Sequence, residues 1–154
     1  MTAVFEDFYK NVPEEHKSFV SSLHKQLTKQ GCTVNIKEAK HGHTASYLLN
    51  RKTIMKWVFQ KSGITARIYG DNLKQYEKVI TALPVNMHAK MKKSRDCRCL
   101  SSSGCNATSI KGLIFELDNH TYMKCRYHGM FFLLTEQSGQ YIEKLVTEEL
   151  KARQ

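Results

Sequence analysis

Hydrophobic positions in the first thirty residues recur with the spacing of a helix. One face of the segment after Pro13 carries four of them, Phe19, Val20, Leu23 and Leu27. Proline early in such a segment and Gly31 at its end are typical start and stop signals of a helix. A shorter helical pattern precedes it in "VFEDFYKN". We therefore predict an N-terminal helical region over residues 1–31.

From residue 33 the hydrophobic period changes to two, which is typical of strands. This alternation marks four segments, "TVNIKEA", "ASYLLNR", "KTIMKWVFQ" and "ITARIYG", separated by the turn-like "HGH", "NRK" and "KSG". An apolar stripe at helical spacing follows in "LKQYEKVITALP", and a shorter helical piece in "VNMHAKMKK". We predict an antiparallel meander followed by helix, and assign it to a first unit, residues 33–93.

After a cysteine-bearing loop, residues 94–110, the strand pattern returns in a second unit, residues 111–154, which ends in the helical "SGQYIEKLVTEELKA". A shift of about 68 positions pairs Leu49 with Leu117, Thr53 with Thr121, Met55 with Met123, and Lys56 with Lys124. The sequence thus predicts one α+β domain, residues 1–154, in which two related antiparallel strand-strand-strand-helix units form a pseudo-symmetric pair after the N-terminal helices. The alternative is that two amphipathic hairpins followed by helices resemble each other by pattern alone.

Alternation also predicts which side chains face the core. Met55, Trp57 and Phe59 share one strand face while Lys56 points away, so these aromatic residues are predicted to be core rather than a platform that stacks nucleic-acid bases. In the second unit the same rule groups Thr121, Met123, Cys125 and Tyr127 on a face predicted to be buried, opposite Tyr122, Lys124 and Arg126.

Four cysteines form the candidate metal site: Cys97, Cys99, Cys105 and Cys125. Their number suits a tetrahedral zinc site, although the spacing is not the pair of C-x-x-C knuckles found in many such sites. His88 and His128 are possible substitute ligands. Two alternatives remain open. The cysteines are ordinary reduced or buried thiols, with Cys125 filling the place of Trp57, or they serve redox or nucleophilic chemistry.

Charge points to an anionic partner. The chain has 24 Lys and Arg against 14 Asp and Glu, a formal net charge of +10. The excess concentrates in "HAKMKKSRDCR", which carries Lys90, Lys92, Lys93, Arg95 and Arg98. This run predicts binding of nucleic acid or another anionic ligand; a solvated basic helix end is the alternative.

The second half of the chain has the pattern "RDCRCL", "CNATS" and "GLIFELDNHTYMKCRYHGMFF". Over residues 95–132 it resembles the C-terminal half of an uncharacterised family of small bacterial proteins with a cysteine loop and a Tyr-x-Lys-Cys-Arg strand. The resemblance implies a bacterial source and brings no established activity. The family pattern has a further cysteine where this chain has Ser109, so a four-thiolate site of the family would here need Cys99 or a histidine.

Several function classes have no signal. A phosphate-binding glycine loop, a nucleophile elbow and an H-E-x-x-H helix are absent from the sequence, as are a secretory signal and a membrane-spanning run. A cytoplasmic location is predicted. We predict a non-catalytic binding module with a cysteine-ligated structural zinc and a basic surface. The alternatives are a small-molecule sensor with a ligand between the two units, and a thiol- or metal-dependent enzyme that uses the same cysteines.

Overall fold

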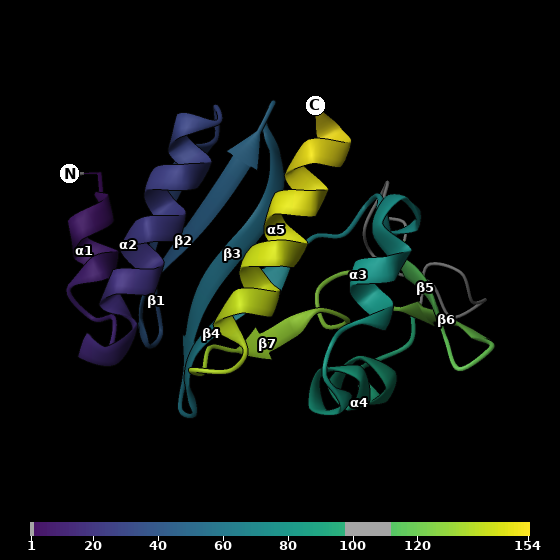
Figure 1. Ribbon diagram of the computed structural model, residues 1–154. Helices are drawn as coiled ribbons and strands as arrows, with labels where there is room; N and C mark the ends of the chain where they lie inside the picture. Colours follow the sequence, from purple (N-terminus) through teal and green to yellow (C-terminus); the bar gives the residue numbers. More distant parts are fainter. Residues whose placement is uncertain (1, 98–111) are drawn as a thin grey trace.

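The structure is a computed structural model that describes residues 2–97 and 112–154. It is a mixed α+β fold, as predicted, and its main sheet is antiparallel and has five strands (Figure 1). The elements in chain order are α1 (Phe5–Tyr9), α2 (Glu14–Lys29), β1 (Thr33–Ala39), β2 (Gly42–Leu49), β3 (Lys52–Gln60), β4 (Gly63–Ile68), the 3-10 helix η1 (Leu73–Tyr76), α3 (Glu77–Thr81), α4 (Val85–Lys93), β5 (Leu113–Leu117), β6 (His120–Lys124), β7 (Phe131–Leu133) and α5 (Gly139–Arg153). In the described residues, no helix has the length and apolar character needed to cross a membrane.

The main sheet has the strand order β1-β2-β3-β4-β7, and every neighbouring pair is antiparallel. Its first four strands form the predicted meander. The β2–β3 turn consists of Asn50 and Arg51, both at positive φ (52° and 68°), a conformation that suits two-residue hairpin turns. Local sequence therefore fixes the order of these four strands, because each is joined to the next by a tight turn.

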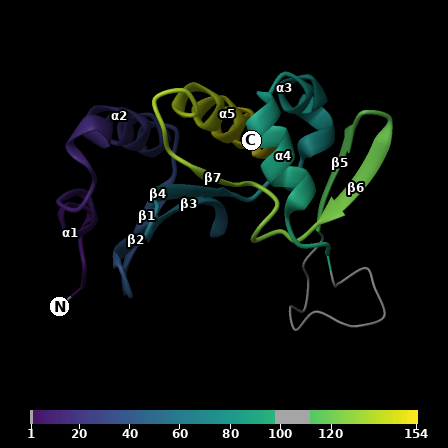
Figure 2. The same cartoon turned by 90° about the horizontal axis from the view of Figure 1, so that it is seen from below.

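Helices α2 and α5 lie on the same side of this sheet, and the core lies between them and the strands (Figure 2). Tyr47, Met55 and Trp57 are completely buried there. Three of the four residues of the predicted α2 stripe are buried: Val20, Leu23 and Leu27. The fourth, Phe19, packs edge-on against Trp57, with the two ring centroids 6.4 Å apart. The prediction that Trp57 belongs to the core is confirmed.

Strands β5 and β6 form a separate two-stranded sheet. Leu113, Phe115 and Leu117 of β5 are buried, and Phe115 stands opposite Tyr122 while Leu113 stands opposite Lys124. Cross-strand partners share a face, so Tyr122 and Lys124 belong to the inner side of the hairpin.

The prediction that residues 121, 123, 125 and 127 share a buried face is therefore wrong. Met123 is 48% exposed, Thr121 and Tyr127 are exposed, and Lys124 is buried. The ammonium of Lys124 is accommodated because it donates to Asp96 at 2.8 Å and to the Ser94 carbonyl at 3.2 Å. A long side chain that finds partners at its tip can occupy an inward position that alternation alone assigns to an apolar residue.

The two pseudo-symmetric units are not confirmed. Strand β7 pairs with β4 of the first unit and not with β6, so residues 111–154 do not form a meander of their own. The two hairpins at the predicted shift are nevertheless alike. Asp118 and Asn119 repeat the positive φ of Asn50 and Arg51, with values of 55° and 63°.

A buried polar network ties α5 to the end of the sheet. Glu149 is 0% exposed, and its carboxylate accepts hydrogen bonds from Asn72, from the Tyr76 hydroxyl at 2.6 Å and from Arg153 Nε at 2.7 Å. Arg153 also donates to the carbonyls of Thr53 and Tyr69. Burial and the neighbouring Glu149 raise the pKa of Tyr76, so its hydroxyl stays protonated and donates.

Candidate functional site

A basic pocket of about 370 Å³ lies beside β7. Helix α4 contributes Lys90 and Lys93, one turn apart, and the residues after the helix contribute Ser94 and Arg95. The wall opposite is formed by His128 and Phe131. Basic residues at the end of a helix are also favoured by its dipole, so part of this charge supports the helix itself.

The pocket contains three residues of the predicted basic run, Lys90, Lys93 and Arg95. Lys92 is directed elsewhere and forms an ion pair with Asp118, which stabilises the contact of α4 with the β5–β6 hairpin. Arg98 lies outside the described residues. The predicted run is thus divided between a pocket and a surface ion pair.

His128 lies within the field of these cations. Burial and the charges of Arg67, Arg95 and Lys90 hold the pKa of its imidazole below its usual value. The ring is therefore neutral near pH 7 in the ligand-free protein. An anion in the pocket would oppose the same cations and favour the charged imidazolium.

A second group of cations lies on the face of the main sheet that is turned away from α2 and α5. Cross-strand pairing places five residues in one row across the five strands: Asn35, Ser46, Lys56, Arg67 and Phe131. We call this side of the sheet the open face, because Figure 2 shows no helix of the described chain over β1–β4 here. Lys37 of β1 lies on the same face, two positions along its strand from Asn35.

Lys56 and Arg67 stand directly opposite each other, which is unfavourable for two like charges. Burial and the charges of Arg67 and Lys37 lower the pKa of Lys56. The guanidinium of Arg67 lies over the Phe131 ring at 4.8 Å and the Tyr127 ring at 5.9 Å. Its Nε is buried and finds no hydrogen-bond partner among the described residues. Phe131 also lines the basic pocket, so the row and the pocket form one continuous surface.

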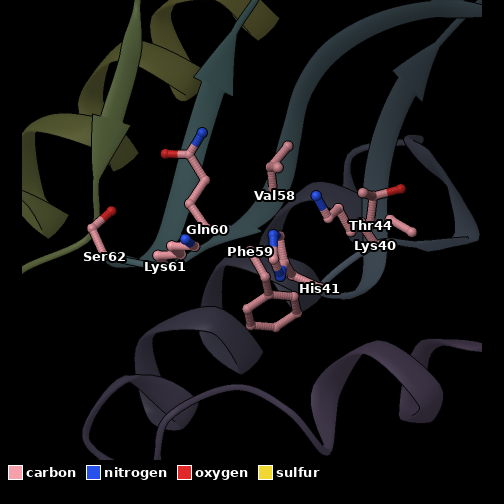
Figure 3. A pocket seen from close by; sticks show the side chains of 9 residues that line it. Lys40, His41, Thr44, Val58, Phe59, Gln60, Lys61 and Ser62 are labelled. Atoms are coloured by element: carbon pink, nitrogen blue, oxygen red, sulfur yellow. The ribbon is translucent and has the colours of Figure 1, made fainter.

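A shallow pocket of about 580 Å³ lies where the β1–β2 and β3–β4 turns come together (Figure 3). Thr44 and Val58 from the open face line it together with Gln60, and the turns add cationic side chains at Lys40 and Lys61. Positive charge therefore borders the open face at its turn end as well.

Two of the four predicted metal ligands come together in the structure. An antiparallel β-bridge joins Asp96 to Lys124. Beside it, the Cys97 N–H donates to the backbone carbonyl of Met123, and the Cys125 N–H donates to that of Arg95. Cys97 and Cys125 are thereby directed to the same side of the bridge. A Cβ atom on Gly112 would meet Cys97 Sγ at 2.6 Å, so the glycine lets the returning chain pass close to the thiol.

Cys99 and Cys105 lie outside the described residues, where the metal set is not tested. Within residues 2–97 and 112–154, no group of three or more His, Cys, Asp or Glu side chains is arranged to hold a metal ion. Of the substitute ligands, His88 Nε2 hydrogen-bonds the Ile80 carbonyl at 2.7 Å, and His128 lies in the basic pocket. His88 thus has a structural partner at the α3–α4 junction.

Sequence reasoning missed the cations of the open face. Alternation placed Lys56 away from the core, and this was the available signal. Its position opposite Arg67 depends on the β3–β4 register, and their link to Arg95 depends on β7 pairing with β4. Comparison of the chain with family models, curated proteins and solved structures finds no match.

Proposed function

We propose that this protein is a non-catalytic binding module that holds an anionic group in the pocket of Lys90, Lys93, Arg95 and His128. The observation that carries the proposal is the unneutralised charge of this pocket. All 14 Asp and Glu residues of the chain lie in the described part, and none forms an ion pair with Lys90, Lys93 or Arg95. Three cations grouped without a carboxylate gain most from an external phosphate or carboxylate.

Pyrophosphate is a suitable probe, because it carries the charge without a base or sugar. In a titration followed by backbone amide NMR, we expect the largest shifts at residues 90–95 and 128. Lys93→Gln combined with Arg95→Gln should weaken binding by about tenfold, the sum of two modest charge pairs. The matched control is Lys25→Gln combined with Lys29→Gln on α2, which removes the same charge from exposed positions across the sheet.

Shifts spread evenly over all basic segments, or equal losses in the two double variants, would contradict a site in this pocket. A small anionic metabolite would use the same side chains; the sensor alternative, by contrast, places its ligand between the two predicted units. The metabolite's affinity would depend little on the cations of the open face, whereas the affinity of a polymeric ligand would depend on them.

We propose in addition that a zinc ion held by Cys97, Cys99, Cys105 and Cys125 fixes the loop 94–110. Support comes from the bridge that brings Cys97 and Cys125 to one side, and from Cys99, which follows Cys97 by two residues. Elemental analysis of tag-free protein should find about one zinc per chain, with thiols masked until a chelator is added. Serine variants of all four cysteines that melt at the unchanged temperature would exclude a structural zinc. Rapid alkylation below neutral pH would instead favour a thiol enzyme.

The remaining predictions are proposals of the same kind. For the predicted duplication of a strand-strand-strand-helix unit, the support is limited to one hairpin of each unit, in the matching positive-φ turns at Asn50–Arg51 and Asp118–Asn119. Kinship with the small bacterial proteins that share the cysteine loop, and a location in the cytoplasm, rest on the sequence patterns described above.

A further inference from the structure

We infer that the ligand of this surface is a single-stranded nucleic acid that runs from the basic pocket across the open face of the sheet. The inference rests on the proposed function and extends it from one anionic group to a polymer. Its basis is the continuity of the pocket with the row of Arg67 and Lys56 through Phe131.

The row is built to present charge outward. The guanidinium of Arg67 lies over the rings of Phe131 and Tyr127, and these contacts limit the freedom of its side chain. Its buried Nε lacks a hydrogen-bond partner in the described chain, so no protein acceptor offsets the guanidinium charge at that atom. Lys56, opposite, is repelled by Arg67 and Lys37, and an anion bridging these groups would relieve that repulsion.

The open face carries no negatively charged side chain from the described part of the protein. Every strand position of the open face in β1–β4 and β7 is occupied by a cationic, neutral polar or apolar residue. Residues 98–111, outside the described part, contain Arg98 and Lys111 and no carboxylate. An anionic ligand would therefore meet no competing carboxylate of this chain on the face.

A single strand fits the dimensions and chemistry of this face. Five strands about 4.8 Å apart give a row of about 19 Å, which suits a short single-strand site of roughly four nucleotides. Tyr127 is 37% exposed and its ring lies next to Arg67, so an aromatic side chain for stacking with a base is present at the surface. Val58, and Leu133 at 39% exposure, add apolar contacts that phosphates on the outside of a duplex would not use.

The experiment is fluorescence anisotropy with a labelled 12-nucleotide oligothymidine, repeated from 50 to 300 mM salt. Lys56→Gln combined with Arg67→Gln should weaken binding on the order of tenfold at 0.1 M salt. It should also reduce the slope of log affinity against log salt by about 1.4, because two phosphate contacts are lost at roughly 0.7 each. Lys25→Gln combined with Lys29→Gln should change neither quantity.

Arg67→Gln also removes packing against two rings, so a second variant is needed. Lys37→Gln combined with Lys56→Gln leaves Arg67 in place and should still weaken binding several-fold. Thermal melts establish that each variant is folded.

The inference is overturned if the sheet variants bind oligothymidine as the unchanged protein does, or if a duplex of the same length binds as tightly as the single strand. If pyrophosphate binds the pocket while oligothymidine binds no more tightly than pyrophosphate, the proposed function stands and the polymer track fails. If oligothymidine depends on Lys56 and Arg67 while Lys93→Gln with Arg95→Gln has no effect on either probe, the pocket proposal fails instead.

Discussion

Two arginines next to the same sheet have opposite surroundings. Arg153 is 9% exposed in its side chain and is bonded to Glu149, to Asp71 and to two backbone carbonyls. Arg67, two strand positions before Tyr69, has no carboxylate partner in the described chain and lies on aromatic rings. The chain thus neutralises the cation that holds α5 to the strands and leaves the cations of the open face without counter-charge. The difference shows a structural role for Arg153, and the binding role proposed above for Arg67 rests on its lack of a carboxylate partner among the described residues.

The largest effect on stability should come from removing the buried ion pair between Glu149 and Arg153. Glu149→Gln removes the buried carboxylate that Arg153 Nε contacts at 2.7 Å, leaves only the longer contact with Asp71 at 3.3 Å, and puts an amide N–H among donors. Removing one partner of a buried ion pair costs about 3–5 kcal/mol, so the free energy of unfolding should fall by that amount in a urea titration.

The matched control is Glu148→Gln, one residue earlier on α5. Glu148 pairs with Lys144 and Lys151, whose side chains are 55% and 69% exposed. Exposed pairs contribute about 0–1 kcal/mol, so this variant should melt close to the unchanged protein. Equal losses in the two variants would show that the network of Glu149 has no special role.

The open face allows the reverse change, in which a carboxylate is supplied. Ser46 stands opposite Lys56 in the β2–β3 register, so Ser46→Asp places a negative charge next to Lys56. An opposite-charge cross-strand pair adds about 0.2–1 kcal/mol to stability. It should at the same time weaken oligothymidine binding on the order of tenfold, because the ligand then competes with an internal anion and is repelled by it.

Ser46→Asn is the control, since it has nearly the size of aspartate without the charge. It should leave oligothymidine affinity within about twofold, because a neutral amide adds neither repulsion nor competition. If both variants lose binding equally, the open face acts through shape and not through charge.

Local sequence predicted those parts of the fold that depend on near neighbours. The strands predicted from alternation at 33–39 and 52–60, the helical stripe of Val20, Leu23 and Leu27, and the mixed α+β class are all present in the structure. These features arise from side-chain periodicity and short turns, which a single sequence displays directly.

Long-range pairing produced the differences. Strand β7 joins β4 across more than sixty residues, and no periodicity records that partner. The inward position of Lys124 depends on Leu113 opposite and on Asp96 at its tip. Glu149 lies in the charged segment "VTEELKA", which by its sequence is typical of a helix surface. Its burial depends on contacts with Asn72 and Tyr76, which are distant in the sequence. For the candidate site, the basic run around Lys90–Arg95 could be identified in the sequence. That Lys56 and Arg67 lie close to it follows only from the β3–β4 and β4–β7 pairing registers.

The smallest effect should be a pH dependence of anion binding in the pocket. Arg67, Arg95, Lys90 and burial depress the pKa of His128 in the free protein, and a bound anion raises it. Pyrophosphate affinity should therefore increase as the pH falls from 7.5 through the window between the two pKa values, and level off below the lower one. A single partly exposed charge pair makes the gain about two- to threefold.

Stability of the free protein should change in the opposite sense. The unfolded chain binds a proton at His128 more readily than the folded chain does, so the free energy of unfolding decreases as the pH falls below the ordinary histidine value of 6.5. His128→Gln should flatten both His128 contributions while leaving affinity at pH 8 nearly unchanged, because the imidazole is neutral there. His16→Gln, on α2 and outside this pocket, is the control and should retain both pH dependences. Retention of the affinity gain in His128→Gln would contradict this role of His128 and assign the proton to another group of the protein.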